Sequence, residues 1–175
     1  MSVLPYLVAA FLSLSPFAAP RAMATQADLF SGLMNWAVRL SKYPAPSAMP
    51  VVRYVPQQFF DEHACGGHHC EVWGWYPNTG KNVVYVDENV RDLLNDGSNA
   101  RSVLAASIIV HEFVHYLQAV SRHFARYDCM QALQLEREAY QAQSAYLMSY
   151  GRYLPVGVSM HSASCVGTAS DGPIK

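Results

Sequence analysis

The sequence predicts an α+β fold in a single domain, and three observations support this class. Residues 100–120 and 128–150 are two long segments of helix-forming composition, and the first of them is largely apolar. Three short extended segments, at residues 51–55, 71–76 and 82–86, precede them in the chain. The chain is long enough for one hydrophobic core and contains no repeat or low-complexity tract. We therefore expect a small antiparallel sheet packed on two long helices.

The first predicted element is a helix over Gln26–Lys42, in which apolar residues recur every three or four positions. The sequence Tyr43-Pro44-Ala45-Pro46 ends it, because proline cannot continue a helix. Residues 51–55 form a β-branched run, which favours a strand. Segments 71–76 and 82–86 flank a Pro-Asn-Thr-Gly sequence typical of a tight turn, so they are expected to form a hairpin.

Helices are expected to make up most of the chain after the sheet. A short helix is predicted from Asp87 or Asn89 through Leu94, because a polar, glycine-containing stretch follows it. Ser98 or Asn99 can cap the first long helix, since short polar side chains accept hydrogen bonds from the free amides of a helix start. The second long helix follows after a break. The resulting order of helix, sheet and further helices is that of an α+β domain.

The first long helix carries His111-Glu112-Phe113-Val114-His115, an H-E-x-x-H motif. Two histidines four residues apart project from one face of a helix, so their imidazoles can bind the same ion. Neutral imidazole is a good ligand for zinc, and Glu112 lies beside the ion, where its carboxylate can take a proton from bound water. The motif therefore predicts a Zn²⁺ site with Glu112 as general base. The alternative is that His111 and His115 are hydrogen-bonded core histidines.

A catalytic zinc site needs a third protein ligand, and the second long helix offers two candidates in Glu136-Arg137-Glu138-Ala139. An H-E-x-x-H motif followed some twenty residues later by a helix with E-x-x-A resembles the gluzincin group of zinc metallopeptidases. The short chain is similar to the small, single-domain minigluzincins among uncharacterised bacterial families. The resemblance implies a zincin-like fold in which Glu136 is the third ligand and Glu138, on the opposite side of the helix, points away. The alternative is that both glutamates belong to a solvated helix face.

The chain departs from the gluzincin pattern at the residue after the small one. Many gluzincins carry Asp there as a partner for a zinc-binding histidine, whereas this chain has Tyr140. The resemblance then leaves Tyr140 or Gln143, which lie on the same helix face as Glu136, to orient a ligand or assist the reaction. The metzincin pattern is excluded, because Gln118 and Ser121 stand where it requires Gly and His.

The first 24 residues are expected to be a signal peptide. Val3–Ala19 is almost wholly apolar or small, and Ala22-Met23-Ala24 matches the A-x-A pattern of a cleavage site. The apolar run contains prolines, is short for a membrane span and follows no Lys or Arg; an uncleaved anchor is the alternative. We expect cleavage after Ala24, one domain over residues 25–175, a secreted or periplasmic location and no membrane span once the leader is removed.

The charge balance argues against a nucleic-acid partner. Lys plus Arg number 12 and Asp plus Glu number 13, which gives a formal net charge of −1. Removal of the expected leader takes away Arg21 and no acidic residue, so the remaining domain is slightly more acidic. Proteins that bind the phosphate backbone carry an excess of positive charge on at least one face.

The four cysteines are expected to form two disulfides, because an even number in a secreted chain is typical of such pairing. Three pairings are open, and the expected one joins Cys65 to Cys70 around Gly66-Gly67, which leaves Cys129 for Cys165. A second metal site is the alternative for the first pair, since three histidines lie near it. These histidines are His63, His68 and His69.

These observations favour a secreted zinc-dependent hydrolase that cleaves the amide bonds of a peptide or protein substrate. The alternative is a non-catalytic zinc-binding or interaction domain that retains the helix, although a structural site is usually closed by four ligands and has no use for Glu112. A third interpretation is a hydrolase of amide bonds in cell-wall or small-molecule substrates.

Two parts of the predicted site stay open. The resemblance implies that an edge strand pairs with an extended substrate, and Trp73–Tyr76 or Val83–Val86 can do this unless their aromatic residues merely pack the sheet. The group that stabilises the oxyanion lies late in the chain. The candidates are Tyr140, Tyr146, Tyr150, Tyr153 and His161.

Overall fold

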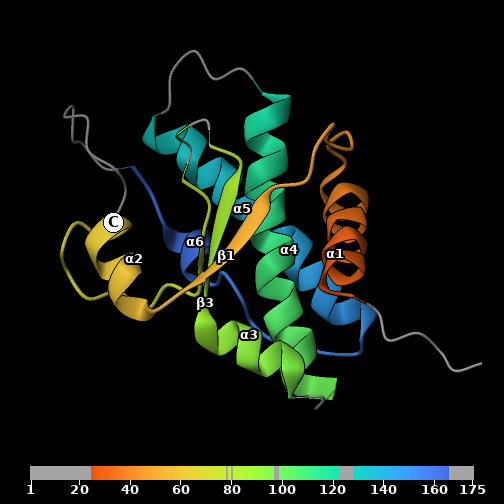
Figure 1. The fold of residues 1–175 in the computed structure, drawn as a ribbon. Helices are drawn as coiled ribbons and strands as arrows, with labels where there is room; N and C mark the ends of the chain where they lie inside the picture. The colour runs from red at the N-terminus through yellow and green to blue at the C-terminus, as the bar shows by residue number, and fades with distance from the viewer. Residues whose placement is uncertain (1–24, 78, 80, 97–98, 123–127, 166–175) are drawn as a thin grey trace, which may run out of the picture.

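The computed structural model describes residues 25–77, 79, 81–96, 99–122 and 128–165. They form a three-stranded sheet and a set of helices, with the long α4 packed on α5, so the predicted α+β class is confirmed (Figure 1). The expected signal peptide at residues 1–24 lies outside the described residues. The elements are α1 (Gln26–Ser41), β1 (Val51–Val55), α2 (Gln57–His63), β2 (Gly74–Trp75), β3 (Val83–Asp87), α3 (Glu88–Asn95), α4 (Asn99–Ser121), α5 (Cys129–Ser149) and α6 (Ser159–Ser162).

The sheet is mixed, whereas the sequence predicted an antiparallel one. Its strand order is β1-β3-β2, with β1 parallel to β3 and β2 antiparallel to β3. The chain leaves β1 through α2 and a loop before it enters β2, so β1 and β3 are not joined by a hairpin and can run in the same direction. The predicted strand at 71–76 is only two residues long. β2 is an edge strand, and β3 is central and paired on both sides.

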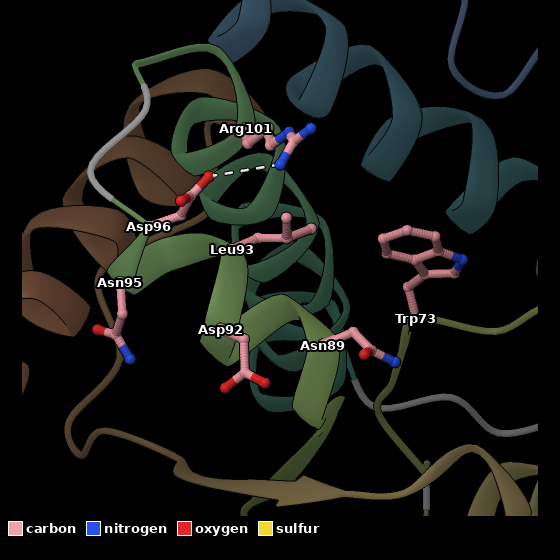
Figure 2. A pocket seen from close by; sticks show the side chains of 7 residues that line it. All are labelled: Trp73, Asn89, Asp92, Leu93, Asn95, Asp96 and Arg101. Carbon is pink, nitrogen blue, oxygen red and sulfur yellow. Dashed lines mark ion pairs between the residues drawn. The ribbon is translucent and has the colours of Figure 1, made fainter.

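Trp73 directly precedes β2. Together with α3 and the first turn of α4, it lines an open cleft (Figure 2). The central position of β3 makes Val83–Val86 unsuitable for pairing with a substrate, so that alternative is wrong. The turn between β2 and β3 was predicted at Pro-Asn-Thr-Gly, of which Asn78 and Gly80 lie outside the described residues.

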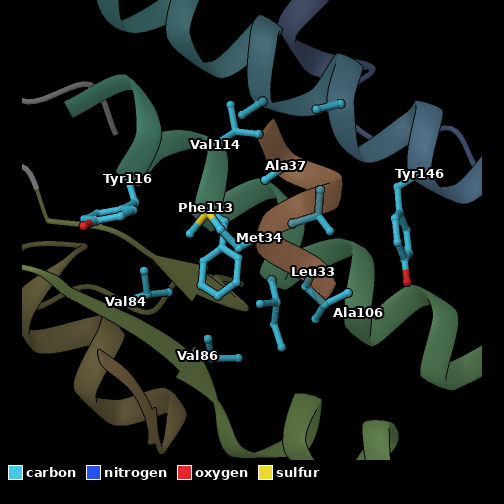
Figure 3. Close-up of a cluster of buried hydrophobic side chains, with 14 of the residues drawn as sticks. Leu33, Met34, Ala37, Val84, Val86, Ala106, Phe113, Val114, Tyr116 and Tyr146 are labelled. Atoms are coloured by element: carbon cyan, nitrogen blue, oxygen red, sulfur yellow. The ribbon is translucent and has the colours of Figure 1, made fainter. Parts of the chain in front are cut away.

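The core forms around α4. Its residues Phe113 and Val114 are fully buried, and they belong to one core cluster with Val84 of the sheet and Met34 of α1 (Figure 3). A capping box at Thr25, which accepts from the amide of Asp28, fixes the start of α1. The helices α1, α3 and α5 and the strands β2 and β3 all contact α4, which is therefore the central element of the fold.

Among the described residues, α4 contains the one segment that is long and apolar enough to cross a membrane by length and composition. This segment is Ala100–Ser121, and its mean hydropathy reaches 1.5 over 18 residues. Of that window, 72% is buried inside the fold, which is the environment of a core helix.

Both predicted disulfides are present: Cys65 is bonded to Cys70, and Cys129 to Cys165. The second bond joins the first residue of α5 to the segment after α6. Arg137 holds the same segment, since its guanidinium donates to the carbonyl oxygens of Met160 and Ala163, each at 3.0 Å. Arg137 follows Glu136 directly, so the tail and the predicted ligand are fixed to the same turn of α5.

Removal of the Cys129–Cys165 bond is expected to destabilise the protein more than removal of Cys65–Cys70. The two bonds close chain separations of 36 and 5 residues. By loop-closure entropy they are worth roughly 4 and about 2 kcal/mol of unfolding free energy. Denaturant unfolding of the two double Cys→Ser variants measures the difference. Equal losses of stability, or a larger loss for the short loop, would contradict the prediction.

Candidate metal centre

Three side chains that can hold a metal ion converge between α4 and α5. The Nε2 atoms of His111 and His115 are 3.1 Å apart, and the Glu136 carboxylate oxygens lie 3.4 Å from the first and 3.3 Å from the second. Ligands at the corners of a tetrahedron around zinc, with bonds of about 2.1 Å, are separated by roughly 3.4 Å. The donor set and its spacing therefore fit a tetrahedral ion with these three residues as ligands.

The packing of the two helices positions the group. His111 and His115 lie one turn apart on α4, and Ala139, one turn after Glu136, is fully buried where α5 meets the core. The small side chain lets the two helices approach closely. His111 is buried, whereas the Glu136 side chain is 40% exposed, so the group opens to solvent on one side. A metal ion there has a coordination position that the protein does not fill.

The charges of these side chains are strongly coupled. Burial alone would raise the pKa of Glu136, but hydrogen bonds and charge interactions with the two imidazoles hold it well below its usual range. Burial would lower the pKa of His115, and the Glu136 carboxylate instead raises it to about 9. Burial dominates at His111 and lowers its pKa. The Glu136 carboxylate thus favours a positive charge next to the two imidazole rings. A divalent cation bound there would supply that charge.

Gln118 orients His115. Its amide nitrogen donates to the Leu135 carbonyl at 3.0 Å and to Glu138 Oε2 at 3.2 Å, which leaves its Oε1 as the acceptor, 2.8 Å from His115 Nδ1. When His115 is neutral, as a metal ligand must be, its proton therefore lies on Nδ1 and the lone pair of Nε2 faces the metal position. Gln118 is itself buried, with 1% of its surface exposed. In the sequence, Gln118 stands out only as a departure from the metzincin pattern.

Glu138 points away from the metal group, as the spacing predicted, and anchors Gln118 from the other side. Its carboxylate accepts from Tyr43 Oη at 2.6 Å and from Arg122 Nη2 at 3.1 and 3.2 Å. A chain of hydrogen bonds thus runs from His115 through Gln118 to Glu138. From there it continues to Tyr43, just after α1, and to Arg122, just after α4. No sequence signal identified Tyr43 or Arg122, since they meet Glu138 only in the folded chain.

Replacement of Gln118 by Leu is expected to weaken zinc binding by roughly 10- to 100-fold, because loss of a hydrogen bond to a ligating histidine has effects of this size. The leucine fills a similar volume but leaves His115 Nδ1 without its acceptor. Competition with a chelator of known affinity measures the zinc dissociation constant. The matched control is Gln134→Leu, which removes an exposed amide that also donates to Glu138. Equal affinities for both variants would rule out the orienting role of Gln118.

Glu112 is buried beside the metal group, against the edge strand. An ideal Cβ atom on Gly74 would lie 2.7 Å from Glu112 Cγ and Oε1, so only glycine fits at this position of β2. The backbone of Tyr76 donates a hydrogen bond to the carboxylate, whereas Oε2 has no partner among the described residues. Burial raises the pKa of Glu112 to about 8. The side chain is thus a buried, basic carboxylate next to the predicted ligands.

His111 has a different environment from His115. The Tyr140 ring packs edge-on against the His111 ring, with centroids 4.4 Å apart. Gln143 lies nearby and donates to Ser107 Oγ at 3.2 Å. The Nδ1 atom of His111 is buried, with no hydrogen-bond partner in the described part of the chain. The predicted roles of Tyr140 and Gln143 in orienting a ligand or assisting the reaction therefore remain predictions.

Gly157 keeps Tyr140 in place. A Cβ atom at this glycine would meet Tyr140 Cγ at 2.3 Å, and its φ of +66° is itself unfavourable for other residues. The other oxyanion candidates lie in different surroundings. Tyr146 and Tyr150 pack at a tilt, with ring centroids 5.0 Å apart and Trp36 beside them. Tyr153 is 89% exposed, and His161 is an exposed residue of α6. Tyr140 is thus the candidate in direct contact with the metal group.

The alternative of a second metal site near Cys65 is not supported. The two cysteines of that loop are bonded to each other. His69 pairs with Asp61 at 3.1 Å, and His63 stacks on Phe59 with ring centroids 4.2 Å apart. Within the described ranges, His111, His115 and Glu136 are the one group of three or more side chains arranged to hold an ion.

Comparisons with protein-family models, with curated proteins and with solved structures found no match.

Proposed function

We propose that this chain is a zinc-dependent peptidase. The observation that carries the proposal is the convergence of His111, His115 and Glu136 at tetrahedral spacing beside the buried Glu112 carboxylate. The side chains match the donor set that zinc takes in catalytic sites, which is two histidines and one carboxylate with an open position. The exposed side of Glu136 supports that open position, whereas a purely structural site would be closed.

Each residue has a distinct role in the proposed reaction. A zinc ion, when bound by His111, His115 and Glu136, supplies a Lewis acid that activates water and polarises the scissile carbonyl. Glu112 accepts the proton of the attacking water and then donates it to the leaving amine. Burial raises the pKa of the Glu112 carboxyl in the metal-free site, whereas a bound cation would favour its ionised form, which is the form that accepts a proton. Gln118 holds His115 in the tautomer that binds metal.

The edge strand supports a peptide as the substrate. β2 pairs with β3 on one side only, and its Gly74 lies against Glu112. An extended peptide that adds to the free side of β2 would pass the proposed base at this position. Gly74 and Trp75 are the strand residues available for such pairing.

A location outside the cytoplasm is part of the proposal. The two disulfides favour an oxidising compartment. Secretion through a leader that is cleaved after Ala24 accounts for that location.

The test combines metal analysis with hydrolysis of a broad peptide library by the purified protein. We expect one zinc ion per chain and cleavage that a chelator abolishes and added zinc restores. A protein that binds zinc without cleaving any peptide would favour the non-catalytic zinc domain. Cleavage confined to cell-wall fragments or small amides would contradict a peptide substrate but support the zinc hydrolase mechanism.

A further inference from the structure

A shallow cleft lined by many charged and amide side chains includes Trp73, one residue before the glycine that packs against the proposed base. Two adjoining surface depressions, of about 720 and 320 Å³ and open to solvent, share Trp73 and Asn89 in their walls. Trp73 directly precedes Gly74, the residue packed against Glu112. A long side chain of a substrate bound at the metal centre can therefore extend into the cleft.

The exposed indole of Trp73 is the main apolar surface of this cleft. Its side chain is 45% exposed, and Figure 2 shows it standing apart from α3, with the amide of Asn89 directed towards it. The Asp96–Arg101 ion pair, at 3.7 Å, closes the far end. Among the described residues that line the two depressions, Leu93 is the one aliphatic residue. Such a lining does not favour an aliphatic side chain.

The charge of the walls is negative. Among the described residues, four carboxylates and one guanidinium, that of Arg101, line the two depressions. Arg91 does not line the cleft, but its Nε lies 3.1 Å from Asp92 Oδ1. With Arg91 included, the acidic side chains still outnumber the basic ones. The four acidic residues are Glu71, Asp87, Asp92 and Asp96.

Asp87 adds an unsatisfied acceptor to this surface. It is 4% exposed and caps α3, with its Oδ1 accepting from the backbone and side-chain nitrogens of Asn89 at 2.8 and 2.7 Å. Its Oδ2 is buried and has no hydrogen-bond partner among the described residues, although Asp87 lines the smaller depression. A buried carboxylate oxygen without a donor is unfavourable, and a cationic donor from a ligand relieves this most strongly.

We propose that the cleft around Trp73 binds a basic side chain, arginine or lysine, of the peptide substrate. The aliphatic part of such a side chain covers the indole, and its cation lies over the ring and among the carboxylates. A neutral sugar can also stack on tryptophan, but it gains nothing from the excess of negative charge. This inference rests on the proposed peptidase function and names the substrate feature that the same site selects.

The test compares peptides that carry arginine or citrulline at one position and are otherwise identical. Citrulline keeps the shape and removes the charge. At one position relative to the scissile bond, arginine is expected to raise kcat/KM by about tenfold or more, the size of effect that a charge-assisted contact gives. Trp73→Ala, Glu71→Gln and Asp92→Asn should lower this ratio. Glu62→Gln, which neutralises an exposed acid outside the cleft, should leave the ratio unchanged.

A binding experiment separates this inference from the peptidase proposal. The zinc-loaded Glu112→Gln protein is titrated with the two peptides and with a neutral chito-oligosaccharide, and tryptophan fluorescence is followed. Tighter binding of the arginine peptide that depends on Trp73 supports the cleft, even if no peptide is ever cleaved. Peptide cleavage without a difference between arginine and citrulline overturns it. Binding of the saccharide through Trp73, with equal affinity for both peptides, also overturns it.

Discussion

Replacement of Glu112 by Gln is expected to lower kcat by roughly 10²- to 10⁴-fold, the usual contribution of a general base, while zinc content stays near one per chain. The amide keeps the shape of the side chain but cannot accept the proton. Glu112 is not among the three side chains that converge on the metal position, so their donor atoms are unchanged. Peptide hydrolysis and metal analysis on the same preparation measure both quantities.

The control for this variant is Glu62→Gln, the same chemical change at an exposed position of α2. It should have normal activity and zinc content. Loss of zinc from Glu112→Gln would assign Glu112 to the ligands, and retained activity would exclude it as the base. Either result would contradict the proposed mechanism.

The same substitution has a predicted effect on stability in the metal-free protein. Burial raises the pKa of Glu112 to about 8 from an ordinary value of 4.5, so ionisation opposes folding. Its unfavourable contribution begins above pH 4.5 and grows until pH 8, which means that the wild-type protein loses stability as the pH rises through this range. The Gln variant lacks this contribution. Denaturant unfolding between pH 5 and pH 8 should therefore show a weaker pH dependence for the variant.

Local sequence signals predicted the helices well. Asp87, one of the two residues predicted to start the short helix, accepts a hydrogen bond from the backbone amide of Asn89 at the start of α3. The long apolar run of α4 and the bracketing of a glycine turn by Cys65 and Cys70 are also local features. Each of these predictions depends on residues close together in the chain, and the structure confirms them.

Predictions that depend on distant parts of the chain were less successful. The parallel pairing of β1 with β3 follows from the path through α2, a helix of seven residues that is too short to show a periodic pattern. No pattern in the sequence predicted α2, although its residue Phe60 is fully buried. The predicted strand over 71–76 shrank to β2 because only Gly74 and Trp75 find partners on β3.

The candidate site shows the same division. The histidines of the motif lie on one helix, so their relation is fixed by helical geometry alone. The supporting residues come from the crossing of α4 and α5, which brings Gln118 to the Leu135 carbonyl and to Glu138. Gly74 is required only because the edge strand passes against Glu112. No spacing in the chain predicts these contacts.

The two glutamates of α5 are expected to respond differently to the same substitution. Glu136→Gln should weaken zinc binding by on the order of 100-fold or more, because it removes a charged ligand, and should abolish hydrolysis. Glu138→Gln keeps all three ligands. It removes the charge that holds Arg122 and accepts from Tyr43, and it disturbs His115 only through Gln118. Its effect on zinc affinity should be about tenfold or less, since the contact with the ligand is indirect.

Unfolding measurements with and without zinc separate ligand loss from structural damage in these two variants. Zinc stabilises only proteins that bind it in the folded state, so the stability that zinc adds to Glu136→Gln should be small. Glu138→Gln should lose stability in the metal-free form, because its ion pair and its hydrogen bonds to Tyr43 and Gln118 are altered, and should still gain stability from zinc. The reverse pattern would identify Glu138 as the ligand. That result would require α5 to be rotated by about half a turn from the arrangement described here.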